Sequence, residues 1–209
     1  MLRRIKIHQL EMMQLRGKVI PKEELPILDM NDLSFNQYLA NASNRRPLNN
    51  IYYDNNNKNP LAVYYIKSTE GPSVKSDEFD SEFIELIKQD NVKDVILITL
   101  NIIKSIVSKL AEYPAYNITV FNHSELIINP TKHIYAEKII RKLTDAEKKT
   151  HGIRPENMRQ LCYDDPIVKF YGFVPGDIIL CSTETPDPKA LVGRYTNTKI
   201  IGVGSIKNL

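Results

Sequence analysis

The order of apolar segments in the middle of the chain is the feature that most restricts its fold. Strand-like runs at Leu61–Ile66, Lys93–Thr99 and Tyr116–Phe121 alternate with helix-like segments, one beginning at Asp77 and one spanning Ile102–Tyr113. The run Lys93–Thr99 is continuously apolar at its centre, whereas the segment after Asp77 carries apolar residues three or four positions apart. This alternation predicts a small α/β domain whose sheet is covered by helices.

The N-terminal part predicts helices followed by a β-hairpin. An amphipathic helix from Leu2 should end at Arg16-Gly17, because a cation followed by glycine suits a helix C-terminus. A further helical turn should begin near Pro21, and Phe35–Ala42 should form another helix. The run Leu48–Tyr53 should pair with the next strand, since Asp, Asn and Pro fill the connection between them.

Length and composition indicate two modest domains, residues 1–132 and 133–209. Of the 209 residues, 42% are apolar and 25% are charged, which is typical of globular proteins and argues against disorder. The net charge of +3 is too small for a dedicated nucleic-acid binder. No apolar run approaches the roughly 20 residues of a membrane span, and no signal-peptide core is present. We therefore expect a soluble, intracellular protein with no membrane partner.

The C-terminal part predicts a small α+β domain. Thr144 and Glu147 form a capping box, in which each side chain can bond a free backbone amide at the start of a helix. Three short strands should follow, at Asp177–Cys181, Leu191–Thr196 and Lys199–Val203.

The densest local pattern lies in residues 164–179. Asp165 can cap a short helix, Pro166 suits its first position, and Gly172 can take the left-handed conformation at its end. Pro175-Gly176 fits a type II turn that leads into a strand. The segment therefore predicts a helix, a turn and a strand, and this structural role alone would explain each of these residues.

This segment resembles the C-terminal signature of the fifth subunit of eukaryotic-type RNA polymerases, a family that also has archaeal members. Further stretches resemble the same family in the same order, and together they span nearly the full length. They are Met13–Ile20 with Glu23-Glu24-Leu25, Glu125–His133, Thr183-Glu184-Thr185 and Gly193-Arg194-Tyr195. Each match alone is weak, but their collinearity is specific. On this basis the chain is identified as a divergent member of that family.

The resemblance implies a non-catalytic polymerase subunit with no catalytic residue, metal, cofactor or small-molecule substrate of its own. The first domain would be a jaw domain with a truncated nuclease-like fold, near downstream DNA. The second would be an assembly domain that docks on the largest subunit, with other polymerase subunits as neighbours and the active site in the large subunits. The implied docking positions are Asp165, Pro166, Gly172, Gly176 and Arg194. Lys104 and Lys109 would lie near DNA, with a merely solvated face as the alternative.

Several departures from the family pattern mark the chain as divergent. Tyr135–Ile139 replaces the usual Val-Pro-Lys-His, Met158–Leu161 reduces a Leu-Pro-Arg-Ile element, and a Thr-Pro pair expected after Thr99 is missing. The resemblance therefore does not carry over the contacts made by these motifs. A large DNA virus with its own polymerase would account for the divergence. The protein would then act in the virion or host cytoplasm, whereas a cellular form would be nuclear.

Two other functions fit parts of the pattern. A metal-dependent nuclease needs acidic residues and a lysine at neighbouring strand ends, but Asp94 opens its strand with no acid-x-Lys in the next. Asp164-Asp165, the histidines and the two cysteines lack metal-ligand spacing, so we interpret Cys162 and Cys181 as reduced and structural. The second alternative is a free-standing adaptor or regulator of the same fold that has lost its polymerase contacts.

Overall fold

The chain divides into two compact units, Met1–Asn129 and Pro130–Leu209. The division falls three residues before the domain boundary predicted from the sequence. The computed structural model describes residues 1–41, 48–66, 83–88, 91–100, 110, 113–133, 138–150, 158–183 and 194–201. We refer to the two parts as the N-terminal unit and the C-terminal unit.

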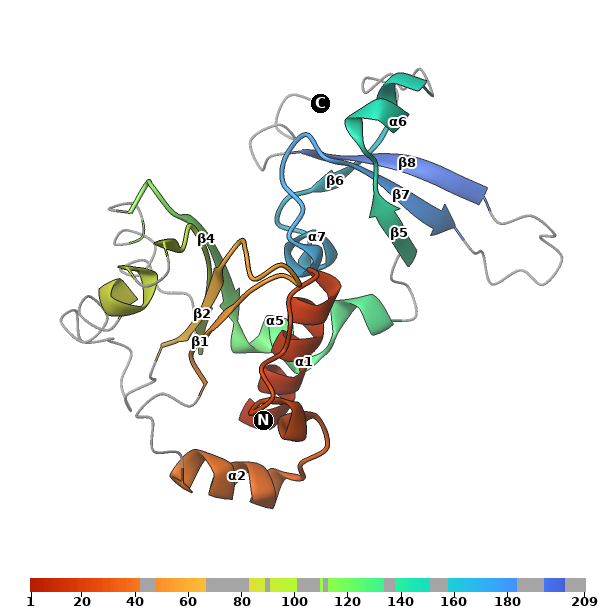
Figure 1. Cartoon of the computed structure of the whole chain (residues 1–209). Coiled ribbons are helices and arrows are strands. Elements are labelled where there is room, and N and C mark those ends of the chain that lie inside the picture. The colour runs from red at the N-terminus through yellow and green to blue at the C-terminus, as the bar shows by residue number, and fades with distance from the viewer. Residues whose placement is uncertain are drawn as a thin grey trace, which may run out of the picture. The chain divides into compact units, whose positions relative to one another are not determined.

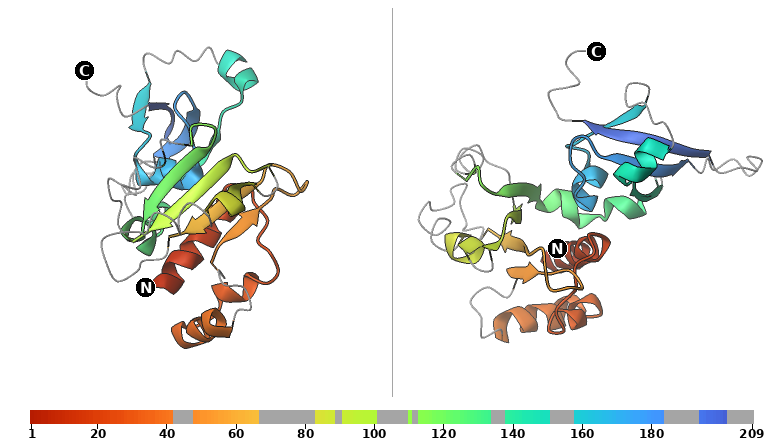
Figure 2. Two further views of the ribbon diagram at one scale, coloured as in Figure 1. Left: turned by 90° about the vertical axis from the view of Figure 1, so that its left-hand side faces the viewer. Right: turned by 45° about the horizontal axis from the view of Figure 1, so that its top comes forward.

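Four strands form a mixed sheet in the N-terminal unit, in the order β1-β2-β3-β4 (Figure 2). β1 (Asn50–Tyr52) pairs antiparallel with β2 (Leu61–Tyr65), whereas β2, β3 (Asp94–Thr99) and β4 (Asn117–Asn122) run parallel. The predicted hairpin and the three predicted strands are therefore present, with ends shifted by one or two residues. Parallel neighbours need long crossover connections, which explains why apolar helical segments separate these strands in the sequence.

Helices of the N-terminal unit include α1 (Leu2–Leu15), α2 (Asp32–Asn41) and α5 (His123–Ile127) (Figure 1). The predicted end of the first helix is confirmed, because Arg16 is the C-cap and Gly17 follows with φ of 72°. Only glycine takes this left-handed conformation without a steric cost. Helices α1 and α5 pack on each other, while α2 lies apart from the sheet in both views of Figure 2.

The helical turn predicted near Pro21 begins a few residues later than expected. Only a single 3-10 turn forms, η1 (Leu25–Leu28). The Glu24 amide donates to the Pro21 carbonyl and the Ile27 amide to the Glu24 carbonyl, at 3.0 Å each. Both bonds span three residues, which is the spacing of a 3-10 turn.

The core of the N-terminal unit lies on the sheet formed by β2 and β3. Ala62, Tyr64, Val95 and Leu97 are buried there together with Phe83, which belongs to the helical residues 83–88. Alternate residues of a strand share one face, so these side chains line the same side of the sheet. Asp77, the predicted cap, and most of the helix predicted at 102–113 lie outside the described residues.

The C-terminal unit contains a second four-stranded sheet, in the order β5-β7-β8-β6. β7 (Ile178–Thr183) pairs antiparallel with β5 (Lys138–Lys142) and with β8 (Arg194–Ile201), and β6 (Arg159–Cys162) runs parallel to β8. Helix α7 (Pro166–Tyr171) packs on this sheet, because Val168 shares a buried cluster with residues of β7. The unit also holds the short helices η3 (Pro130–Lys132) and α6 (Asp145–Thr150).

The strand prediction for the C-terminal unit is wrong in two respects. The expected strands Leu191–Thr196 and Lys199–Val203 are one strand across residues 194–201, because Asn197 and Thr198 pair with Leu180 and Ile179 of β7. Pairing with a neighbour keeps these polar residues extended where a turn seemed possible. Strands β5 and β6 were not predicted, because they are short and rich in charged or polar residues.

The predicted capping box at the start of α6 is confirmed. The Glu147 amide donates to Thr144 Oγ1 at 3.3 Å, and the Thr144 amide donates to Glu147 Oε2 at 2.9 Å. Arg141 on β5 also donates to Glu147 Oε2, at 2.7 Å. Hydrogen bonds from Arg141 and Thr144 lower the pKa of Glu147 from 4.5 to about 2.

This low pKa predicts an acid-sensitive contribution to stability. A carboxyl whose pKa is lower in the folded state stabilises the fold above its unfolded value, near 4.5, and loses this effect as the pH falls towards 2. We expect Glu147→Gln to remove this part of the pH dependence, measured as the free energy of unfolding at several pH values. An NMR titration of the Glu147 carboxyl carbon with a midpoint near 4.5 would contradict the prediction. Arg141→Gln should shift that midpoint upward.

Candidate docking module in the C-terminal unit

Four of the five residues predicted to dock on a partner lie within residues 165–179, which we call the docking module. It consists of α7, the turn after it and the start of β7. The helix begins as predicted, because Asp165 Oδ1 accepts a hydrogen bond from the Ile167 amide at 2.8 Å and Pro166 occupies the first helical position. The cap satisfies one of the amides that a helix start leaves without a partner.

The predicted glycine at the end of α7 is also confirmed. Gly172 has φ of 75° and ψ of 30°, in the left-handed region. The Gly172 amide donates a hydrogen bond to the Val168 carbonyl at 3.0 Å, and the Phe173 amide donates to the same carbonyl at 3.1 Å. The left-handed residue lets the chain reverse while the last helical carbonyls keep their hydrogen bonds.

A tight turn at Val174–Asp177 links α7 to β7. The Asp177 amide donates to the Val174 carbonyl at 3.0 Å, and Gly176 has φ of 95°, as a type II turn requires at its third position. The Asp177 carboxylate accepts the Val174 amide at 3.0 Å and pairs with Lys142 of β5 at 2.6 Å. Sequence reasoning missed this role of Asp177, whose signal was an acidic residue directly after the Pro-Gly pair.

The docking module has buried side chains in α7 and an exposed apolar turn at Val174-Pro175. Val168 and Phe170 point into the core and are fully buried, and the Phe173 ring stacks on Tyr171 at 5.3 Å between centroids. In contrast, Val174 is 51% exposed, and the neighbouring Pro175 is exposed as well. An apolar side chain held by such a turn suits contact with another protein, because little conformational freedom remains to be lost on binding.

The structure brings four of the five predicted docking positions together. Asp165, Pro166, Gly172 and Gly176 lie within the docking module, each with a local structural role. Arg194 lies at the start of β8, where its backbone pairs with Thr183 at the far end of β7. The two lysines predicted near DNA, Lys104 and Lys109, lie outside the described residues.

A metal site, a nuclease, a disulfide or a membrane span would each require particular features of the described residues. Within the described part of the chain, no three His, Cys, Asp or Glu side chains are grouped as metal ligands. The Asp94 carboxylate, at the start of β3, accepts a hydrogen bond from the side-chain nitrogen Nδ2 of Asn117 at 3.0 Å. Cys162 and Cys181 are free thiols, as predicted. None of the described helices is long and apolar enough to cross a membrane.

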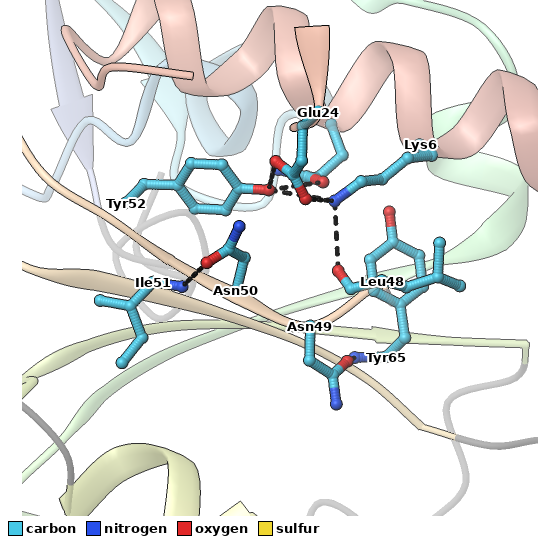
Figure 3. Close-up of polar contacts among 9 residues, drawn as sticks. Lys6, Glu24, Leu48, Asn49, Asn50, Ile51, Tyr52 and Tyr65 are labelled. Carbon is cyan, nitrogen blue, oxygen red and sulfur yellow. Dashed lines mark hydrogen bonds and ion pairs between the residues drawn. The ribbon is translucent and has the colours of Figure 1, made fainter. Parts of the chain in front are cut away.

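A second set of polar residues lies inside the N-terminal unit, and the sequence did not predict it. We call it the polar cluster: Lys6 and Gln9 of α1, Glu24 before η1, and Tyr52 of β1. Figure 3 shows Lys6, Glu24 and Tyr52 pointing toward one another. Lys6 and Gln9 are fully buried and Glu24 is 3% exposed. The available signal was the position of Lys6, since it shares the buried side of α1 with Met13 one heptad later.

Comparison with known proteins points to one class. No protein-family model matches the chain. The chain is 26% identical over 99 residues to "DNA-directed RNA polymerases IV and V subunit 5B" of Arabidopsis thaliana, which covers 46% of the chain and 45% of the relative. It is 24% identical over 110 residues to "DNA-directed RNA polymerase V subunit 5A" of the same plant, covering 51% and 49%. The matches thus span about half the length of these curated relatives.

Both relatives carry the name of a polymerase subunit numbered five. The resemblance to the fifth-subunit family that the motifs indicated is therefore supported over about half of the chain. A viral source stays a prediction, because both relatives are plant proteins.

Proposed function

We propose that the chain is a non-catalytic subunit of a multisubunit DNA-directed RNA polymerase. In this proposal the C-terminal unit is an assembly domain that docks on the largest subunit. The N-terminal unit is a jaw domain near downstream DNA. The observation that carries the proposal is the sequence similarity to two plant polymerase subunits numbered five. The proposal gives the chain no cofactor, metal or catalytic residue of its own.

The docking module supports the assembly role. Its backbone is held by the Asp165 cap, the Gly172 reversal and the bonds of Asp177, while Val174 stays exposed. Protein interfaces gain affinity when an apolar anchor is already in its bound geometry. We therefore expect Val174 and Pro175 to contact the partner, and the capping residues to act by positioning them.

The net charges of the two units bear on whether the proposed jaw domain contacts DNA directly. Residues 1–129 contain 15 Lys and Arg against 16 Asp and Glu, a net charge of −1. Residues 130–209 contain 13 against 9, a net charge of +4. A net negative unit is not drawn to DNA as a whole, so any contact would depend on individual cations such as Lys104 and Lys109. We therefore expect assembly with protein subunits to dominate, with DNA reached through the complex.

Affinity purification of the tagged full-length chain from its native source tests the proposal. We expect the large polymerase subunits to co-purify and to be identified by mass spectrometry. Val174→Asp should reduce their recovery, because a charge at the exposed tip opposes an apolar contact, while Leu33→Asp serves as the matched control in the other unit. Leu33 is 68% exposed, so that variant should also fold.

The alternative is a free-standing adaptor of the same fold. The replacement of the family motif at Tyr135–Ile139 favours it, because contacts made by that motif would be lost. Purification of the chain without any large polymerase subunit, from cells that contain the polymerase, would favour the adaptor and reject the polymerase role. The same experiment in fractionated cells or particles decides between nucleus, cytoplasm and virion.

A further inference from the structure

The polar cluster uses every proton of its lysine. Lys6 Nζ donates to Glu24 Oε1 at 2.7 Å, to Tyr52 Oη at 3.0 Å and to the Leu48 carbonyl at 3.2 Å (Figure 3). An ammonium group has three N–H donors, so no donor of Lys6 is left over. The second carboxylate oxygen, Glu24 Oε2, accepts the Tyr52 hydroxyl at 2.6 Å.

The proton count also assigns the orientation of Gln9. Gln9 Oε1 lies 3.5 Å from Tyr52 Oη, and the Gln9 amide nitrogen has no partner. Tyr52 has one hydroxyl proton, and the short contact with Glu24 uses it, so Tyr52 cannot also donate to Gln9. Turning the amide by 180° lets Gln9 Nε2 donate to the free lone pair of Tyr52 Oη. The four residues then form a connected network in which Lys6, Glu24 and Tyr52 are satisfied.

Burial of the Lys6 charge has a cost that its attraction to Glu24 does not remove. Lys6 and Glu24 have side chains 0% and 3% exposed, so both have lost their hydration. Burial lowers the pKa of Lys6 even though the neighbouring Glu24 carboxylate acts in the opposite direction. The ammonium is thus less favoured here than in water, as expected where desolvation exceeds the Coulomb gain.

The polar cluster joins three segments that are distant in sequence. It links α1, residues 18–28 and β1. Of these three segments, only residues 18–28 belong to neither a long helix nor a strand of the sheet. At its start the segment is also held by directional contacts, because the Lys18 amide donates to the Met13 carbonyl at 2.9 Å and the Val19 amide to the Tyr53 carbonyl at 2.8 Å, and Lys18 forms a β-bridge with Asp54. Beyond Val19, apart from the polar cluster, the segment lies against the unit through the buried Ile20 and Ile27. Apolar contacts tolerate sliding, whereas a directional network is satisfied in one arrangement only.

We propose that the polar cluster selects a single arrangement of residues 18–28 against α1 and β1 while adding no net stability. It is a conformational device, and its role does not depend on the polymerase function proposed above. The proposal makes two separable predictions for the purified full-length chain. Breaking the network should lower the stability of the fold. Replacing all four residues with apolar ones should restore stability but not the single arrangement of residues 18–28.

The first measurement is the melting temperature. Lys6→Met leaves Glu24 buried without its cation, and we expect Tm to fall by about 6–20 °C. The combined variant Lys6→Met, Gln9→Met, Glu24→Leu, Tyr52→Phe should recover to within about 5 °C of the parent or exceed it. Lys148→Met, which breaks the exposed ion pair with Asp145, is the control and should leave Tm nearly unchanged.

The second measurement is amide hydrogen exchange in residues 18–28. The Lys18, Val19, Glu24 and Ile27 amides are hydrogen-bonded and serve as reporters. We expect their exchange in the combined variant to rise by about tenfold or more, with exchange in β2 and β3 unchanged. A combined variant that stays as unstable as Lys6→Met, or fails to fold, would overturn the proposal, since the network would then supply net stability. Recovered Tm with parental exchange at these amides would overturn it equally.

Discussion

Replacing Phe83 with alanine should lower the free energy of unfolding of the N-terminal unit by about 3–5 kcal/mol. The side chain is fully buried, and its ring meets those of Tyr64 and Tyr113 edge to face, each at 5.6 Å between centroids. Truncation removes buried apolar surface, leaves a cavity, and deletes two aromatic contacts worth about 0.5–1.5 kcal/mol each. Phe83 is thus a central contact between the helical residues 83–88 and the sheet.

Urea denaturation followed by circular dichroism measures this effect. The chain has no Trp and 11 Tyr, so tyrosine fluorescence gives a second signal. Leu33→Ala is the control, because Leu33 is 68% exposed and its truncation should change stability by less than about 0.5 kcal/mol. A loss below about 1 kcal/mol for Phe83→Ala would mean that residues 83–88 do not pack on the sheet as the structure shows.

Replacing Gly172 with valine should destabilise the C-terminal unit by about 1–3 kcal/mol. Gly172 has φ of 75°, a region in which a β-branched side chain clashes with its own backbone. Gly172→Asn should cost less, because Asn tolerates this conformation. Equal melting temperatures for the valine variant and the parent would show that α7 does not end in a left-handed residue.

A matched valine variant in the other unit separates stability from assembly. Gly17 has φ of 72°, and a Cβ added there meets nothing within 4 Å, so Gly17→Val tests backbone strain alone. Because Gly17 and Gly172 have similar φ values, the backbone strain caused by valine should be similar in the two variants. If the C-terminal unit carries the polymerase contact, Gly172→Val should reduce co-purification of large subunits more than Gly17→Val does. Equal losses would argue against a role of the docking module in assembly.

Features that depend on neighbouring residues could be predicted from the sequence. The Asp165 cap, the Thr144–Glu147 capping box and the glycine at 172 each act over three or four positions, so side-chain chemistry and backbone sterics already determine them. Strands β2 and β3 were predictable because burial on both faces requires continuous apolar runs. The same local rules predicted the structural roles of Asp165, Pro166, Gly172 and Gly176, whereas the docking role of these positions came only from the family resemblance.

Long-range pairing could not be read from the sequence. Strands β5 and β6 have polar sequences and are strands because they pair with β7 and β8, and the polar residues within β8 stay extended for the same reason. The burial of Lys6 depends on Glu24 and Tyr52, which lie 18 and 46 positions away. The sequence by itself therefore determined the caps, the turns and the apolar strands, because their causes are local. Only the tertiary structure decided which polar residues are buried or paired, because that depends on partners brought together by folding.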